Sequence, residues 1–291
     1  MNSLSTCLVS LTVLLGLSAC HDGGGSSNSP SSAQIGHLAI SITDAPLDRA
    51  LVAQASIEVR EIKAHTSSSA NSGFVVLYSG VPITIDLLAL NNGVTQLLID
   101  APVPVGSYHQ VRLVVSDARL ELTNGNVYST ANGNLDLTSL DTSGLKIFIQ
   151  PDIEVVSNLS STLLLDVDLS KTFHPIPAND PPNAASFQLM PVIKATNLTD
   201  TGEIRGRVLM DDGLGGTIGV PDANVYIQPP GDLDPANAIA GTGTLADGSY
   251  RVIGLLPGTF DVLATHSVLL GVVPGQVVTV GNATDVDVVI Q

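Results

Sequence analysis

The sequence predicts an all-β protein in which a β-rich N-terminal domain is followed by a seven-stranded β-sandwich. Apolar and polar residues alternate at residues 38–42, 56–63, 110–115 and 119–122. Alternation with a period of two is typical of strands that have one face on a core. Turn-forming dipeptides separate these runs, and no stretch shows sustained helical periodicity.

Four dipeptides predict where the chain turns. Asn124-Gly125 and Asp247-Gly248 each predict a tight hairpin, because both residues tolerate a positive φ. Pro257-Gly258 and Pro274-Gly275 predict type II or tighter turns between strands. Short helical turns are expected only at residues 87–92 and 48–54.

The first residues are typical of an exported protein. The apolar run at residues 8–17 is shorter than the roughly 20 residues that span a bilayer, and it ends at small residues. This pattern predicts a signal peptide over residues 1–19. Residues 20–34 are rich in Gly, Ser and Asn and contain too few apolar residues to bury a core, which predicts a flexible tether.

A further boundary is predicted near residue 198. It divides a β-rich domain of unknown function at 35–198 from a second domain at 199–291. The second block contains three arginines and no lysine. Its short strands, separated by turn signals, are those of a small β-sandwich.

Leu17-Ser18-Ala19-Cys20 resembles a bacterial lipobox. The resemblance implies that Cys20 is acylated and becomes the mature N-terminus, so that a lipid anchor makes the membrane a partner. The residue after the cysteine is His21 rather than Asp, which favours the outer membrane or the cell surface over retention at the inner membrane. The alternative is an ordinary secretory signal in which Cys20 has no role.

The second block resembles the carboxypeptidase-regulatory-like domain, a transthyretin-like sandwich of seven strands. The matching segments are residues 202–208, 220–227, 244–252 and 255–262. The resemblance implies a folding accessory, spacer or adhesive module, in a fold superfamily that includes sugar-binding members. Gly206 is expected where two backbones approach closely, with Tyr250 and Phe260 in the core.

The first block resembles a bacterial and archaeal lipoprotein family known only as domain of unknown function 4382. The matching segments lie at residues 41–46, 85–93, 106–113, 164–168 and 187–194. No established activity comes with this resemblance.

Composition excludes several classes of function. The net charge of −16 disfavours nucleic-acid binding, because the chain repels a phosphate backbone. Cys7 and Cys20 are the two cysteines, so a mature chain with a lipidated Cys20 has no disulfide, thiol nucleophile or zinc–thiolate site. The serine-hydrolase pattern Gly-x-Ser-x-Gly is absent.

No catalytic, cofactor-binding or metal-binding residues are predicted. The histidines that follow the predicted tether do not pair at i, i+2 or i, i+4; they are His37, His65, His109, His174 and His266. Four acidic pairs offer oxygen ligands for a hard cation, with solvated strand faces or loops as the alternative. These pairs are Asp166 with Asp168, Asp211 with Asp212, Asp232 with Asp234, and Asp285 with Asp287.

These patterns lead to a hypothesis of an envelope-anchored, surface or periplasm-facing lipoprotein that acts as a non-enzymatic binding or structural module, with a glycan or an envelope protein as partner. A carbohydrate-binding surface protein is the alternative, and a hydrolytic enzyme is the third. Exposed Tyr108 or Tyr226 beside polar side chains would favour carbohydrate, whereas buried rings would argue against it.

Overall fold

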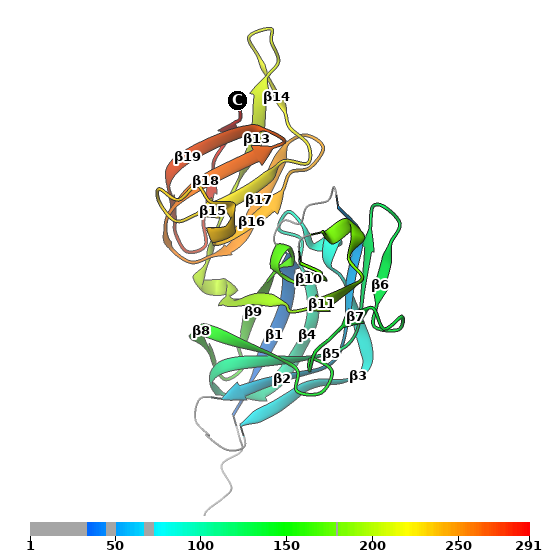
Figure 1. Cartoon of the computed structure of the whole chain (residues 1–291). Coiled ribbons are helices and arrows are strands. Elements are labelled where there is room, and N and C mark those ends of the chain that lie inside the picture. The colour runs from blue at the N-terminus through cyan, green and yellow to red at the C-terminus, as the bar shows by residue number, and fades with distance from the viewer. Residues whose placement is uncertain (1–33, 45–50, 67–72, 179) are drawn as a thin grey trace, which may run out of the picture. The chain divides into compact units, whose positions relative to one another are not determined.

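A computed structural model describes residues 34–44, 51–66, 73–178 and 180–291 (Figure 1). Its largest sheet has nine strands. In spatial order these are β3 (Phe74–Asp86), β2 (Val52–Thr66), β5 (Gly106–Leu122), β8 (Leu145–Val155), β12 (Val192–Asn197), β9 (Ser160–Asp168), β1 (Ile35–Asp44) and β4 (Gln96–Pro104), with β6 (Val127–Ser129) paired to β5.

This sheet curls around its own hydrophobic core. Strands β3 and β4, at the two ends of the spatial order, lie in contact, and Gln96 Nε2 donates to the carbonyl of Thr84 across them. The concave face buries mainly Leu, Ile and Val side chains. Because successive side chains of a strand point to opposite faces, the alternation read from the sequence places one row of each strand in this core.

Short elements complete the N-terminal region. A three-stranded sheet runs in the order β10 (Phe173–Ile176), β11 (Ser186–Leu189) and β7 (Leu135–Asp136). The 3₁₀ turns along the described chain are η1 (Leu87–Leu90), η2 (Leu169–Lys171), η3 (Pro181–Asn183), η4 (Leu198–Asp200) and η5 (Pro235–Asn237).

The C-terminal residues form two further sheets around a separate core. One contains β14 (Thr217–Gly219), β13 (Gly202–Asp211), β17 (Ser249–Leu255), β20 (Ala283–Asp285) and β21 (Val288–Val289). The other has the order β16 (Ala240–Gly243), β15 (Asn224–Gln228), β18 (Gly258–His266) and β19 (Leu269–Val278).

The predicted all-β class is confirmed. Strands β20 and β21 both pair in parallel with β13 and act as one interrupted strand. Strand β14 is a short hairpin extension of β13. With these two taken into account, the C-terminal sheets contain the seven principal strands that the sequence predicted. The predicted domain boundary at 198 and 199 stays a prediction.

The two dipeptides that predicted hairpins have different outcomes in the structure. Asn124-Gly125 forms the expected hairpin between β5 and β6, with Gly125 at φ +88°. At Asp247-Gly248 the chain also turns, with Gly248 at φ +80°, but the flanking strands β16 and β17 belong to different sheets. The predicted hairpin is therefore wrong: this turn carries the chain from one sheet to the other.

The turn predicted at Pro274-Gly275 is also wrong, because both residues lie inside β19. The register between β18 and β19 shifts opposite them, so they form a bulge, with Gly275 at φ +73°. The buried Asp261 holds this bulge, since its Oδ1 accepts from the Gly275 N–H at 2.8 Å and its Oδ2 from the Gly231 N–H at 2.7 Å.

Of the two predicted helical turns, the one at residues 87–92 is present as η1. The described part of the other, residues 51–54, is a turn followed by the start of β2, so that prediction is wrong there. Pairing with β5 outweighs the local preference, since Val52 and Gln54 already lie in register with Leu122 and Glu121.

Gly206 is the point of closest backbone approach in the C-terminal core. A Cβ added to it would lie 1.8 Å from the carbonyl oxygen of Val286. Tyr250 fills the core beside it, with its hydroxyl donating to that same oxygen at 2.6 Å. Phe260 packs against the core and is only partly buried.

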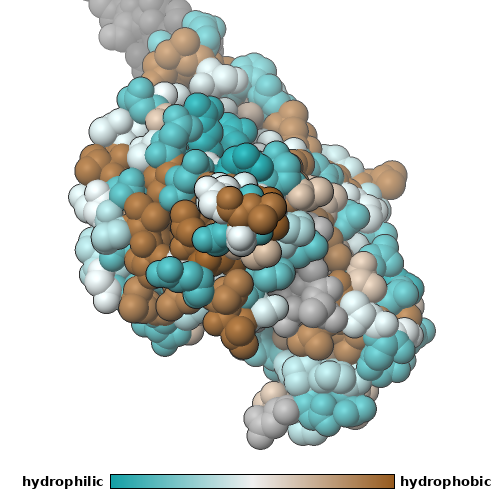
Figure 2. Space-filling model, turned by 90° about the horizontal axis from the view of Figure 1, so that it is seen from above, coloured by the Kyte–Doolittle hydropathy of each residue, from teal (hydrophilic) through white to brown (hydrophobic). Residues whose placement is uncertain are grey.

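Apolar side chains also reach the surface of the C-terminal sheets. Figure 2 shows hydrophobic residues gathered among hydrophilic ones on the face seen from above. Exposed apolar residues in these sheets and their turns include Leu214, Ile218, Val268, Leu270, Val277 and Val289.

Replacing Gly206 by Ala is expected to destabilise the protein by about 2–3 kcal/mol, because the added methyl group forces the β13 and β20–β21 backbones apart. Gly281→Ala is the matched control. Gly281 has φ +70° with open space around its Cβ, so that substitution should cost only about 1 kcal/mol of backbone strain. Denaturant unfolding of both variants measures the difference, and equal losses would contradict the close-approach argument.

Candidate functional site

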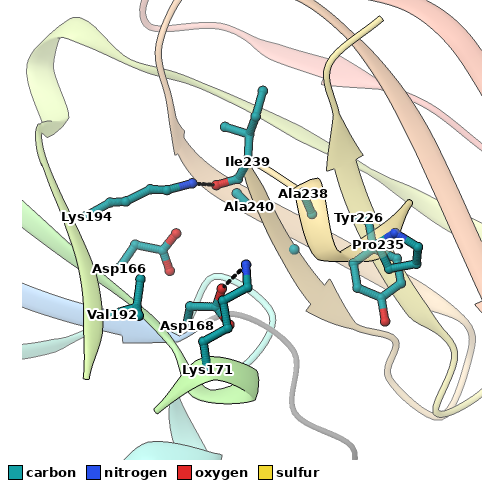
Figure 3. A pocket seen from close by; sticks show the side chains of 11 residues that line it. Asp166, Asp168, Lys171, Val192, Lys194, Tyr226, Pro235, Ala238, Ile239 and Ala240 are labelled. Atoms are coloured by element: carbon teal, nitrogen blue, oxygen red, sulfur yellow. Dashed lines mark hydrogen bonds and ion pairs between the residues drawn. The ribbon is translucent and has the colours of Figure 1, made fainter. Parts of the chain in front are cut away.

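The candidate site is a pocket where β9, η2 and β12 meet the segment that precedes and includes β16 (Figure 3). The cavity has a volume of about 40 Å³, which is room for about three water molecules. Its lining residues are Asp166, Asp168, Lys171, Val192, Lys194, Tyr226, Pro235, Ala238, Ile239, Ala240 and Gly241.

The pleat and register of two strands place the charged groups. Along β9, Leu165 and Val167 point into the core, and Asp166 and Asp168 therefore share the opposite face. Strand β12 lies antiparallel to β9 with Lys194 directly opposite Asp166. The two opposite charges thus form a cross-strand pair at the pocket. The i, i+2 spacing of Asp166 and Asp168 on a strand thus places both carboxyl groups at the pocket.

Both lysines of the pocket are engaged with backbone carbonyls across it. Lys171 Nζ lies 3.0 Å from Asp168 Oδ2 and donates to the carbonyl of Ala236 at 3.1 Å. Lys194 Nζ donates to the carbonyl of Ile239. These contacts fix the two ammonium groups and tie β12 and η2 to the segment before β16.

Asp166 is the group in the pocket whose ionisation is most disturbed. The residue is partly exposed, while its carboxyl group is almost surrounded by protein. Burial raises its pKa to about 7, with a smaller upward contribution from Asp168 and an opposing one from Lys194. Burial also lowers the pKa of Lys194, against the attraction of both carboxylates. A carboxyl group disturbed in this way and facing a cavity is a candidate binding group.

Tyr108 and Tyr226, the two tyrosines considered for carbohydrate binding, have different surroundings. Tyr108 is fully buried in β5, and its hydroxyl donates to the Pro104 carbonyl at 2.8 Å. Tyr226, on β15, is half-buried and lines the pocket. The aromatic ring that sequence reasoning associated with carbohydrate is therefore available at Tyr226 and not at Tyr108.

A second set of contacts fastens the loop after η1 to β16. Asn91 Oδ1 accepts from the Gly243 N–H at 2.8 Å and from the Thr242 hydroxyl at 2.9 Å. The Asn92 N–H in turn donates to that hydroxyl oxygen at 2.9 Å. Strand β16 is thereby held on the side that does not pair with β15, and its residues Ala240 and Gly241 line the pocket.

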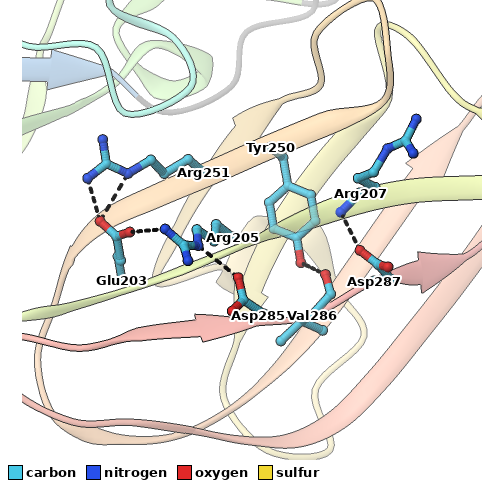
Figure 4. Close-up of polar contacts among 8 residues, drawn as sticks. All are labelled: Glu203, Arg205, Arg207, Tyr250, Arg251, Asp285, Val286 and Asp287. Atoms are coloured by element: carbon cyan, nitrogen blue, oxygen red, sulfur yellow. Dashed lines mark hydrogen bonds and ion pairs between the residues drawn. The ribbon is translucent and has the colours of Figure 1, made fainter.

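The arginines of the C-terminal sheets gather on one face, which sequence reasoning did not foresee (Figure 4). Arg205 and Arg251 lie opposite each other on β13 and β17. Arg251 pairs with Glu203 at 2.5 Å, and Arg205 pairs with Asp285 at 2.7 Å. Such exposed pairs contribute little to stability. The signal available in the sequence was the i, i+2 spacing of Arg205 and Arg207 on one predicted strand.

The other acidic pairs serve the local structure. Asp285 and Asp287 accept hydrogen bonds from the Arg205 side chain and the Arg207 backbone N–H, respectively. The remaining two pairs cap turns by accepting backbone N–H groups within their own loops; they are Asp211 with Asp212 and Asp232 with Asp234.

The histidines are dispersed, apart from one contact. The rings of His65 and His109 meet edge to face at 4.6 Å between centroids. His37 lies 3.1 Å from Asp100, and His174 contacts the Lys171 carbonyl. Within the described ranges, no group of three or more His, Cys, Asp or Glu residues is arranged to hold a metal ion.

The predicted leader, the lipidation of Cys20 and nearly all of the predicted tether fall outside the described residues. In the part of the chain that is described, no helix is both long enough and apolar enough to cross a membrane.

Replacing Asp166 by Asn is expected to stabilise the protein at pH 8 and to have little effect at pH 4. The folded-state pKa of about 7 lies above the ordinary value of 3.8 for this carboxyl group, so the native state holds the proton more tightly than the unfolded chain. Wild-type stability therefore falls as the pH rises from about 4 to about 7, and Asn removes this loss.

The gain at pH 8 should be at least about 1 kcal/mol, discounted for the partial exposure of the side chain, or about 2–4 °C in Tm for a domain of this size. Thermal unfolding across this pH range measures it. The exposed Asp141→Asn is the control, and a pH-independent difference for Asp166→Asn would contradict the assignment.

Comparison with solved structures gives only remote similarities. The minor pilin GBS52 of Streptococcus agalactiae is 11% identical with a TM-score of 0.23, over 87% of this chain and 94% of the pilin. The Bacillus anthracis TIE protein is 12% identical with a TM-score of 0.21, over 89% of this chain and 34% of that protein. The shaft pilin SpaA of Lactobacillus rhamnosus GG is 10% identical with a TM-score of 0.20, over 89% and 97%. At these TM-scores the similarities carry no argument about function.

No curated protein matches the sequence. A family match is found at residues 35–191, which is more than half of the chain. The matched residues extend from the start of β1 to two residues beyond the end of β11 and contain Asp166, Asp168 and Lys171. The chain therefore belongs to the family described as domain of unknown function (DUF4382).

Proposed function

We propose that this protein is an exported lipoprotein, anchored through Cys20 at the outer membrane or cell surface, that acts as a non-enzymatic binding module. Its ligand or partner contacts the pocket around Asp166. The C-terminal sheets, proposed as a carboxypeptidase-regulatory-like domain of the transthyretin-like type, supply one wall of that pocket.

The observation that carries the binding role is the fixed array of polar groups in the pocket. Lys171 and Lys194 donate to backbone carbonyls, and Asp168 lies within ion-pair distance of Lys171. Asp166 is left as the carboxyl group that faces the cavity. Fixed donors and acceptors beside a small cavity support recognition of a polar group.

Two features support the transthyretin-like assignment of the C-terminal sheets. Two sheets enclose one apolar core, and seven principal strands build them. Gly206 and Tyr250, both part of the resemblance, lie at the contact between β13, β17 and the β20–β21 segment. A spacer or adhesive module with this fold is consistent with a binding role for the whole chain.

Carbohydrate binding is the second candidate, and Tyr226 favours it. Sugar rings are recognised by an aromatic face together with polar side chains that bond their hydroxyl groups. Tyr226 and Asp166 both line the pocket. The small volume of the cavity suits the end of a glycan, with one sugar edge inserted.

Replacing Cys20 by Ala should release the protein from the membrane fraction, because the acylated side chain would be lost. Cys7→Ala is the matched control, since Cys7 lies in the predicted leader and should be dispensable for anchoring. Fractionation and immunoblotting of cells that produce each variant provide the measurement. A Cys20→Ala variant that stays with the membranes would refute the lipoprotein proposal.

For the glycan candidate, residues 33–291 should bind specific glycans on an array in a saturable way, with calcium titrated in parallel. Tyr226→Ala should weaken that binding about tenfold through loss of ring contact, while Tyr226→Phe should retain most of it. Absence of glycan binding with and without calcium would exclude this candidate and direct the search to protein partners by pull-down from the native envelope.

A further inference from the structure

Apolar side chains are grouped where the described chain enters β1. Ile35 is 43% exposed, Val156 is 52% exposed and Leu159 is 60% exposed, and the exposed Pro104 lies in register with Ile35. We call Ile35, Pro104, Val156 and Leu159 the β1-end patch. Grouped apolar exposure of this kind marks surfaces that contact a protein or a membrane.

Backbone hydrogen bonds hold this patch in place. The Asn158 N–H donates to the Ile35 carbonyl at 3.0 Å, and the His37 N–H donates to the Leu159 carbonyl at 2.9 Å. Gly36 permits this arrangement, because a Cβ there would lie 2.4 Å from the Val156 carbonyl oxygen. The apolar side chains are therefore held in place by a hydrogen-bonded strand end.

The segments that form the patch contain no Asp, Glu, Lys or Arg. These segments are residues 34–37, 102–107 and 155–160, whereas the chain as a whole carries a net charge of −16. The carboxylates beside these segments are Asp100, which lies 3.1 Å from His37, Asp152, which accepts from the Ser107 hydroxyl at 3.2 Å, and Glu154, which lies opposite Ser107 on the neighbouring strand. The four side chains of the patch are uncharged, and these carboxylates lie at its edge, so contact of the patch with a bilayer surface requires no desolvation of a charge within it.

The position of the patch along the chain, close to the predicted lipid anchor, indicates which surface it contacts. Cys20 and Gln34 are fourteen positions apart, so the strand end lies at most about 50 Å from the anchored residue. We propose that the β1-end patch rests on the phospholipid bilayer that holds the anchor, with Leu159 and Val156 at the boundary between headgroups and acyl chains. This inference rests on the proposed function, because it assumes a lipid at Cys20.

Site-specific fluorescence tests the contact. The chain contains no Trp, so Leu159→Trp places a single reporter in the patch. Residues 20–291 are coupled through Cys20, the one thiol of that segment, to a maleimide lipid in phosphatidylethanolamine–phosphatidylcholine vesicles. Brominated acyl chains should then quench the reporter, with a blue shift of its emission. Val268→Trp, at a position that is 94% exposed on the C-terminal sheets, is the matched control and should show neither change.

Two results would overturn the proposal. One is equal emission from Leu159→Trp with brominated and unbrominated lipid. The other is a blue shift that appears without vesicles and grows with protein concentration, which would assign the patch to a second copy. Adding Ile35→Ser and Val156→Ser to Leu159→Trp should abolish the quenching, and circular dichroism checks that this variant is folded. Because the coupling is chemical, the outcome is independent of whether cells acylate Cys20.

Discussion

Insertion of β12 into the large sheet is the constraint on which the rest of this structure depends. The sheet consists of two halves, β3-β2-β5-β8 and β9-β1-β4, and β12 is the strand that lies between them. It pairs with β9 along its whole length and with β8 at Ala195. The family match ends at residue 191, so the strand that completes this sheet follows directly after the matched residues.

The same strand creates the candidate site. Because β12 lies against β9 in antiparallel register, Lys194 faces Asp166, and the chain then passes through η4 into β13. Two strands of the large sheet therefore carry their charges to the segment before β16. Partial burial of Asp166 beside Lys194 costs stability at neutral pH. Part of that cost is offset by the hydrogen bonds that Lys171 and Lys194 donate to backbone carbonyls and that Asn91 accepts from the Gly243 N–H.

Local chemistry predicted the strands and the positive-φ turns, but it did not predict which strands pair. Asn124-Gly125 made a hairpin because β5 and β6 are neighbours, whereas Asp247-Gly248, with similar chemistry, changes sheets. Pro274-Gly275 became a bulge because Asp261, on the adjacent strand, accepts its backbone N–H. The candidate site could be predicted only in part. The i, i+2 spacing of Asp166 and Asp168 predicts that they share one face of a strand. Lys194 is placed opposite Asp166 by strand pairing, and Tyr226 is brought to the pocket from β15 by the tertiary fold, which local sequence does not reveal. The arginine face was missed for the same reason.

Strand β9 links the two proposed contacts of the molecule. It begins at Ser160, next to Leu159 of the β1-end patch, and ends at Asp168 in the pocket. A rise of about 3.3 Å per residue separates these two ends by about 25 Å. If the patch rests on lipid, the pocket can lie up to about 25 Å above the bilayer surface, beyond most of the headgroup layer. The proposed ligand, a glycan chain or an envelope protein, would then approach Tyr226 and Asp166 from the aqueous side without displacing the anchor.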